Sequence, residues 1–167
     1  EFTMDYYFDK IYPKKYSFKY PKVGERNATV SVHFYNLDKK NKINVQLAPN
    51  AEKYIPRIKW TANPDLMCFT LLNRHQNELK LLLANRLTGN YTNLFIEKND
   101  KYIDINDNLT FLKNGKEFLW FSEKEGFQQA YLYNIQGKLI NKITTMNADI
   151  SKIYGLDEKN RKLYYQV

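Results

Sequence analysis

The chain has 167 residues and a mass of 20.0 kDa, enough for one ordinary domain or two small ones. Hydrophobic residues make up 43% of the sequence and charged residues 26%, which excludes an intrinsically disordered chain. Unbroken apolar runs reach only about four residues, whereas a membrane-spanning helix needs roughly 20, so we expect no membrane segment. The basic and apolar pattern of a signal peptide is not visible either.

The net charge of +8 raises the question of a nucleic-acid partner. Lysine far outnumbers arginine, however, and recognition of phosphates and bases favours the forked guanidinium of arginine. The tightest basic clusters, Lys14-Lys15 and Lys39-Lys40-Asn41-Lys42, lie in turn-like contexts. We therefore interpret the charge as solvated loop residues and expect no nucleic-acid partner.

Residues 1–29 do not fit the pattern of the rest of the chain. The dipeptides Tyr12-Pro13 and Tyr20-Pro21 interrupt strand pairing, because proline cannot donate a backbone hydrogen bond. Several aromatic residues precede them and suggest a segment that lies across another surface. We predict that residues 1–29 form a connector that leads into the repeated part of the chain.

Residues 30–167 contain a repeat with a period of about 49 residues. An asparagine follows a short apolar or alternating run at Asn36, Asn85 and Asn134. The aligned segments are VSVHFYNLDKKNKINVQL from Val30, LKLLLANRLTGNYTNLFI from Leu79 and QAYLYNIQGKLINKIT from Gln129. Fixed spacing between equivalent residues indicates a repeated structural unit rather than ordinary hairpins.

Each unit is predicted to contain short strands joined by polar turns, because period-two alternation is typical of strands. Glu78–Leu87 alone could form a helix, but its β-branched and aromatic counterparts in the other copies favour a strand. Predicted turns with the Asn and Gly chemistry of hairpin loops lie at Arg74-His75-Gln76-Asn77, Leu87-Thr88-Gly89-Asn90, Glu123-Lys124-Glu125-Gly126 and Gln136-Gly137-Lys138.

Four strands in a unit of 40–50 residues are typical of a β-propeller blade. The sequence therefore predicts an all-β fold, a partial β-propeller of about three four-stranded antiparallel blades. Propellers usually close with four to eight blades, so we interpret the chain as an arc of a larger ring. Such an arc has unpaired edges and a tendency to associate.

The sequence contains no recognisable active site. None of its serines lies in a G-x-S-x-G turn, and His33 and His75 lack metal-ligand spacing to each other or to Cys68. We expect both histidines to be surface residues and Cys68 to be buried in a strand. Asp100, Asp104 and Asp107 lack the spacing and the glycine of a calcium loop. No metal and no cofactor are therefore expected.

Aromatic residues on the predicted strands could stack on sugars or bases, but we favour packing between neighbouring blades. The residues concerned are Trp60, Trp120, Tyr131, Tyr133, Tyr164 and Tyr165.

An ordered series of motifs along nearly the whole chain resembles the N-terminal propeller of the dipeptidyl peptidase IV family, in particular its members from the Bacteroides group. The first motif is Tyr20-Pro21-Lys22-Val23-Gly24, followed by Asn27, Thr29-Val30 and Asn36-Leu37-Asp38, which is similar to YPKAG…NPTV…NTD. Later matches are Trp60-Thr61, Leu72-Asn73-Arg74, Gln76-Asn77, Phe111, Gly115, Ser122-Glu123, Gly126-Phe127, Tyr131-Leu132-Tyr133, Tyr154-Gly155-Leu156-Asp157 and Tyr164-Tyr165.

This resemblance implies a serine exopeptidase that removes X-Pro or X-Ala dipeptides from peptide N-termini. In the family, an eight-bladed propeller caps an α/β-hydrolase domain that carries the catalytic triad. The resemblance implies that this domain, and the glutamates that bind the substrate amine, lie outside this chain. The fragment itself is then expected to be inactive and to have the remaining propeller, the hydrolase domain and the peptide substrate as partners.

The same resemblance implies a few site residues and a location. The family's extended subsite falls near Asn106 and Asp107, where its aromatic and arginine residues are replaced, so Asp104, Asn106 and Asp107 are the substrate-proximal candidates. Residues 30–50 resemble a blade extension through which relatives form homodimers. The parent protein is expected to be periplasmic, or located at the cell surface or secreted. The alternative function is a non-catalytic β-repeat module that binds a protein or a glycan through exposed tyrosines.

Overall fold

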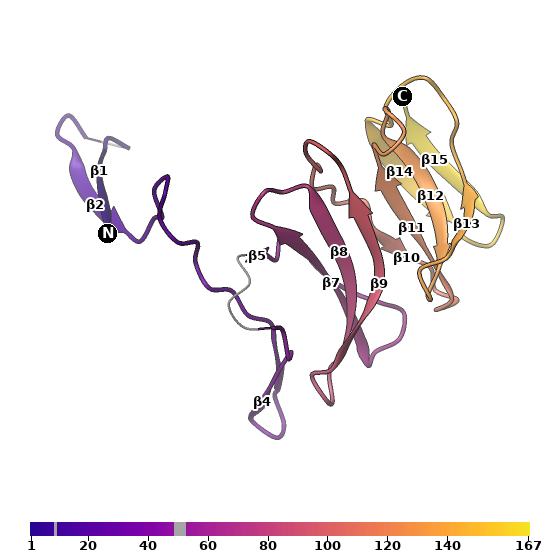
Figure 1. Ribbon diagram of the computed structural model, residues 1–167, viewed down its shortest axis with the longest axis horizontal. Helices are drawn as coiled ribbons and strands as arrows, with labels where there is room; N and C mark the ends of the chain where they lie inside the picture. Colours follow the sequence, from indigo (N-terminus) through magenta and orange to yellow (C-terminus); the bar gives the residue numbers. More distant parts are fainter. Residues whose placement is uncertain (9, 49–52) are drawn as a thin grey trace.

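The computed structural model describes residues 1–8, 10–48 and 53–167, and these ranges contain strands and turns but no helix (Figure 1). None of the described residues therefore belongs to a helix that could span a membrane. All strand pairs are antiparallel, and most strands pair with their neighbours in sequence. The predicted all-β class is confirmed.

Two complete sheets form the centre of the molecule. The first complete blade consists of β6 (Ile58–Trp60), β7 (Leu66–Asn73), β8 (Glu78–Asn85) and β9 (Tyr91–Lys98), with the short β5 (Lys53–Tyr54) beside the far end of β7. The second complete blade consists of β10 (Thr110–Phe111), β11 (Glu117–Ser122), β12 (Gln129–Asn134) and β13 (Leu139–Lys142). The segment that could have formed a helix is strand β8.

Two half-blades flank the complete ones. On one side β3 (His33–Asn36) pairs with β4 (Asn41–Asn44), and on the other β14 (Lys152–Asp157) pairs with β15 (Lys162–Gln166). The sequence predicted about three blades, and the structure has two complete blades and two half-blades. The sheets follow one another as an arc in Figure 1.

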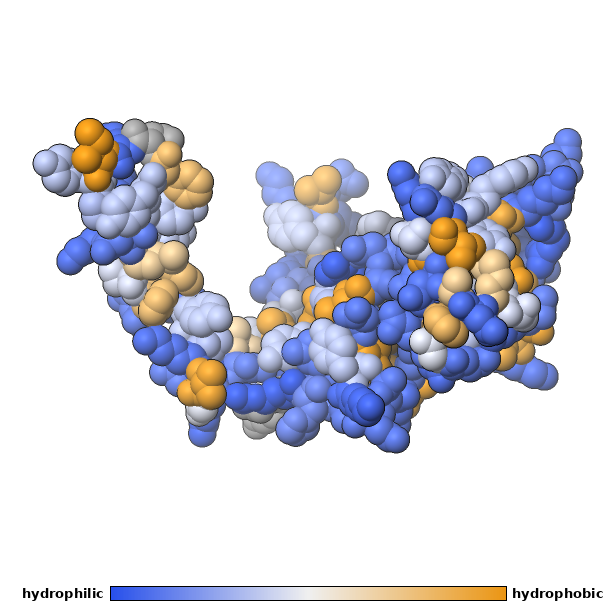
Figure 2. Space-filling model, turned by 90° about the horizontal axis from the view of Figure 1, so that it is seen from above, coloured by the Kyte–Doolittle hydropathy of each residue, from blue (hydrophilic) through white to orange (hydrophobic). Residues whose placement is uncertain are grey.

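The N-terminal arm, by which we mean residues 1–8 and 10–29, contains a hairpin of β1 (Phe2–Tyr6) and β2 (Lys14–Phe18). The hairpin stands apart from the other sheets in Figures 1 and 2. Tyr12-Pro13 lies between the two strands and Tyr20-Pro21 follows the second, as expected of residues that interrupt pairing.

The repeated asparagines close equivalent turns. The side-chain oxygen of Asn36 accepts a backbone hydrogen bond from Lys39 at 2.8 Å. Asn85 accepts bonds from Leu87 and Thr88, and Asn134 from Gln136 and Lys138, at 2.8 to 3.2 Å. A short amide side chain that bonds to the backbone a few residues later stabilises such a turn locally. This requirement explains why asparagine recurs with the blade period.

The turn glycines bring neighbouring blades into close contact. Gly89 and Gly137 have φ values of 74° and 80°, which favour glycine. A Cβ atom on Gly89 would overlap the carbonyl oxygen of Asn44, and one on Gly137 would overlap that of Leu94. Both positions therefore require glycine for conformation and for space.

Among the described residues, the core comprises three apolar clusters, each between adjacent sheets. Between the two complete blades, Phe95 stacks on Tyr133 with ring centroids 4.9 Å apart, and Phe118 lies 5.5 Å from Tyr133. We call this interface the seam. The predicted burial of Cys68, Trp120, Tyr131 and Tyr133 between blades is confirmed.

Two aromatic predictions were wrong. Trp60 is 54% exposed and Tyr164 is 52% exposed, although both were expected to pack between blades. Trp60 lies on the edge strand β6, where its ring approaches only one other aromatic ring among the described residues, that of Phe34 at 6.0 Å. Tyr164 lies on β15, in a two-stranded sheet that is covered from one side. Trp60 is thus exposed because of its edge position, and Tyr164 because it faces the uncovered side of its sheet. The strand pattern reveals neither cause.

Candidate functional site

The three predicted site residues, Asp104, Asn106 and Asp107, lie on the loop of residues 99–109 that joins β9 to β10. We call this the connecting loop. It passes from the first complete blade to the second across one end of the seam. Two of these side chains form hydrogen bonds or ion pairs with other described residues, and one forms none.

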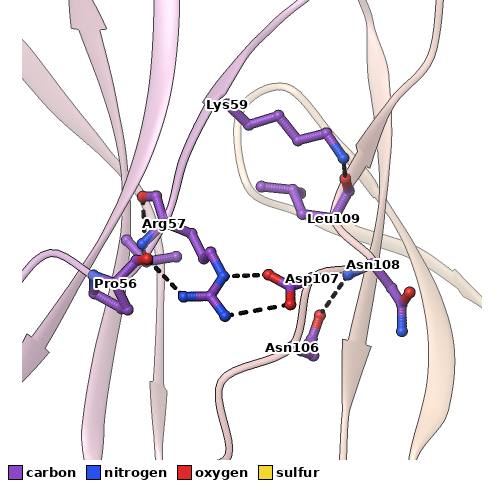
Figure 3. Close-up of polar contacts among 8 residues, drawn as sticks. Pro56, Arg57, Lys59, Asn106, Asp107, Asn108 and Leu109 are labelled. Atoms are coloured by element: carbon purple, nitrogen blue, oxygen red, sulfur yellow. Dashed lines mark hydrogen bonds and ion pairs between the residues drawn. The ribbon is translucent and has the colours of Figure 1, made fainter. Parts of the chain in front are cut away.

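Asp107 is bound by Arg57, which precedes β6 (Figure 3). The guanidinium Nε donates to one carboxylate oxygen, and Nη2 donates to the other at 3.2 Å. The hydrogen bonds from Arg57, followed by its charge, lower the pKa of Asp107. Asp107 is therefore ionised and paired within the protein at neutral pH.

Asn106 bonds to the second complete blade. Its amide nitrogen donates to the carbonyl oxygen of Phe121 at 2.7 Å, and its side-chain oxygen accepts from the backbone of Asn108 at 3.3 Å. Beside it, the Lys59 ammonium group donates to the carbonyl oxygen of Leu109 (Figure 3). The second half of the loop is thus held from both blades.

Asp104 is exposed, and no hydrogen bond or ion pair joins it to any residue in ranges 1–8, 10–48 and 53–167. It lines a small hollow together with Glu97, Glu123 and Lys124. Burial first, and then the carboxylates of Asp104, Asp149 and Glu97, raise the pKa of Glu123. Of the three candidates, Asp104 alone presents an unpaired carboxylate to solvent.

The first half of the loop is tied to the turn between β7 and β8. The backbone nitrogen of Asn99 donates to the carbonyl oxygen of Asn77 at 3.0 Å, and that of Ile103 donates to Gln76 at 2.8 Å. Gln76 and Asn77 belong to the turn predicted at this place.

The seam also contains a partly buried polar contact. The carboxylate of Glu97 accepts hydrogen bonds from the Trp120 indole and the Ser122 hydroxyl, both at 2.7 Å.

A cavity of about 240 Å³ lies behind the connecting loop, between the two complete blades. Its lining includes both apolar and charged residues and consists of Arg57, Ile58, Lys59, Cys68, Phe69, Thr70, Asn106, Asp107, Leu109 and Trp120. Cys68 is fully buried, and this burial raises the pKa of its thiol, so the reactive thiolate is disfavoured. We assign Cys68 to packing.

Sequence reasoning missed a serine–histidine chain on the exposed face of β3 and β4. Ser31 Oγ lies 2.7 Å from His33 Nε2, and His33 Nδ1 lies 2.6 Å from Asn44 Oδ1. All three residues are exposed. Nucleophilic catalysis needs a water-excluded site with donors for the developing oxyanion, which an open sheet face does not offer. Ser31, His33 and Asn44 therefore form a hydrogen-bond network on the surface. His75, the second histidine, is also exposed and lies in its predicted turn.

Among the described residues, no three His, Cys, Asp or Glu side chains come together in a group that could hold a metal ion. The candidate site is a charged, hydrogen-bonded loop that crosses one end of the seam.

Comparison with known proteins gives consistent matches. The family model of the dipeptidyl peptidase IV N-terminal region matches residues 1–167. The crystal structure of Porphyromonas gingivalis dipeptidyl peptidase 4 is similar to the chain with a TM-score of 0.86 and 38% identity, over 99% of this chain and 24% of that one.

Curated sequences match over the same region. Dipeptidyl peptidase 4 of Arthroderma otae is 28% identical over 98% of this chain and 23% of its own length. The inactive dipeptidyl peptidase 10 of Mus musculus is 27% identical over 93% of this chain and 21% of its own length. The chain therefore spans about a quarter of the length of these relatives.

Proposed function

Because the chain belongs to the family of dipeptidyl peptidase IV N-terminal regions, as its motif series predicted, we propose that the protein containing it is a serine exopeptidase that releases X-Pro and X-Ala dipeptides. The observation that carries this proposal is the 38% identity to the Porphyromonas gingivalis enzyme over 99% of the chain.

In this proposal the chain is non-catalytic and forms part of the wall of the substrate chamber. The unpaired carboxylate of Asp104, at the end of the seam, supports a position beside bound peptide. The blades would exclude folded proteins from the chamber and admit flexible peptides. The catalytic serine, histidine and aspartate would be supplied by a hydrolase domain elsewhere in the protein.

The test uses the full-length gene product. Purified protein should hydrolyse Ala-Pro-p-nitroanilide, and replacing the serine of a downstream G-x-S-x-G motif by alanine should abolish this activity. The 167-residue chain alone serves as the control and should be inactive. A gene that encodes no such motif, or a full-length protein without this activity, would refute the proposal.

A second candidate is a non-catalytic binding protein, and the match to the inactive mouse relative favours it. Propeller similarity alone is shared by active and inactive members. A full-length sequence with another residue at the nucleophile position, together with capture of a protein or glycan, would support this candidate instead.

Two further proposals follow from the same family. The parent protein would be located in the periplasm or at the cell surface, which cell fractionation tests. It would form a homodimer through residues 30–50, which contain β3 and β4, while positions 49 and 50 lie outside the described residues. Replacing the exposed Tyr35 and Leu37 by serine should then shift the mass measured by light scattering from dimer to monomer.

A further inference from the structure

We propose that a cavity between the segment after β4 and the first complete blade is a binding site for a small aromatic acid, a molecule that joins one aromatic ring to a carboxylate. The cavity has a volume of about 240 Å³, and we call it the interblade pocket. None of its lining residues belongs to the connecting loop. The assignment therefore does not depend on the peptidase activity proposed above.

The wall of the interblade pocket is largely apolar. Leu71 on β7, Leu82 on β8 and Tyr91 on β9 line it from the first complete blade, and Leu47, which follows β4, lines it from the other side. All four side chains belong to one apolar cluster or pack against it. Protein interiors contain few voids of this size, and an apolar cavity of roughly 150 Å³ already accepts a benzene ring. The pocket has room for a ring and a short side arm.

The second complete blade shows which group fills the equivalent space. Leu82 pairs with Asn93 across β8 and β9, and one repeat period later Tyr131 pairs with Lys142 across β12 and β13. Leu82 and Tyr131 each pack toward the preceding sheet. Tyr131 has no exposed surface, and the ammonium group of Lys124 lies 4.0 Å from the centre of its ring. The pocket thus corresponds to a space that an aromatic ring under a cation fills in the next blade.

The rim of the pocket has an excess of positive charge. Lys53 and Lys80 line it together with the acidic Glu78. The hydrogen bonds from Lys98, at 2.8 Å, and from Lys80, at 3.1 Å, lower the pKa of Glu78, so this carboxylate is ionised and shared by two lysines. Lys53 donates to the carbonyl oxygen of Ala48, and no carboxylate in the described ranges pairs with it. A carboxylate attached to the bound ring would supply this counter-charge.

The first experiment measures binding to the full-length protein by isothermal titration calorimetry. The probe is 4-hydroxyphenylacetate, which carries the ring and the carboxylate. It should bind with a Kd on the order of 0.1 to 1 mM, as expected of a ligand of this size. The alcohol 2-(4-hydroxyphenyl)ethanol keeps the ring without the charge and should bind roughly two- to fivefold more weakly. Acetate, which lacks the ring, should show no measurable binding.

The second experiment locates the ring. Leu82→Phe places an aromatic side chain in the pocket, as Tyr131 does in the second blade, and should abolish binding of the acid without lowering the midpoint of thermal unfolding. Leu82→Met keeps an aliphatic side chain of similar volume and is the matched control, which should still bind the acid.

The third experiment locates the carboxylate and uses a side chain outside the apolar core. Lys53→Gln should weaken binding of the acid roughly two- to fivefold and leave binding of the alcohol unchanged. Lys138→Gln, which replaces an exposed lysine outside the pocket lining, is the matched control and should change neither.

Three results would overturn the proposal. Binding of the acid that persists in Leu82→Phe would place the ring outside the pocket. Equal affinities for the acid and the alcohol, or an acid affinity unchanged in Lys53→Gln, would remove the role of the carboxylate. A wild-type protein that binds neither ring compound would exclude the site. Each result is independent of whether the protein cleaves X-Pro dipeptides.

Discussion

The two complete blades and the N-terminal arm are both rich in aromatic residues, yet they bury them very differently. In the blades, Phe118 and Tyr131 have no exposed surface. In the arm, Tyr7 and Phe8 are 64% and 72% exposed. The arm's rings contact mainly one another, as Phe2 and Phe18 do at 5.7 Å across the hairpin.

This difference shows that burial in the blades comes from the neighbouring sheet and not from the strand itself. A blade sheet is covered on both faces, and every residue of β12 except the last is buried. The arm hairpin has no such neighbour among the described residues, so its apolar surface contributes little to the stability of this chain. Substitutions in the blades and in the arm should therefore differ widely in their effect on stability.

The largest effect should come from the seam. Phe118→Ala removes a fully buried ring that packs against Phe95 and Tyr133, and should lower the free energy of unfolding by about 3 to 5 kcal/mol. Phe8→Ala in the arm is the matched control and should have almost no effect. Urea denaturation followed by tryptophan fluorescence measures both; equal losses would contradict the contrast.

The turn glycines should come next. Gly137→Ala forces a side chain into the carbonyl of Leu94 at a positive φ, and should lower the free energy of unfolding by about 2 to 4 kcal/mol. Gly126 has a φ of 100° but open space around it, so Gly126→Ala should lower it by only about 1 kcal/mol. Thermal unfolding curves of the two variants separate the steric effect from the conformational one.

A smaller effect is expected from the repeated asparagines. Asn134→Ala removes the acceptor of two backbone hydrogen bonds and should lower the free energy of unfolding by about 1 kcal/mol. The neighbouring Gln136→Ala removes an exposed side chain and should have no measurable effect. A stability unchanged in Asn134→Ala would show that the recurrence of asparagine does not reflect turn stabilisation.

The smallest effect should depend on pH. The hydrogen bond from Arg161, across to β15, lowers the pKa of Glu117 on β11. When folding lowers the pKa of a carboxyl group, the resulting stabilisation is complete above the pKa of the unfolded state, about 4.3 for glutamate. This stabilisation is lost as the pH falls through the pKa of the folded state. Arg161→Gln should therefore be slightly less stable than wild type at pH 7, and the difference in stability should close as the pH falls through the folded-state pKa of Glu117.

Part of the candidate site was predictable from local turn chemistry and from the family resemblance. The turn that holds the connecting loop, at Gln76 and Asn77, was expected from local turn chemistry, and the three aspartate and asparagine candidates followed from the resemblance. The partner of Asp107 was not expected. A signal for it existed: Arg57 and Asp107 are separated by 50 residues, as are Lys59 and Leu109, which is close to the blade period. Residues one period apart lie on adjacent blades and can meet across the seam.

Local sequence patterns were sufficient to locate the strands and turns, because alternation, asparagine and glycine act over a few residues of chain. They also revealed the blade period, since each copy repeats the same local requirements. The exposure of Trp60, the pairing of Asp107 and the open carboxylate of Asp104 emerge from the packing of the sheets. These outcomes depend on which sheet edges are covered and on distances between residues far apart in the chain, and no pattern within one strand encodes either.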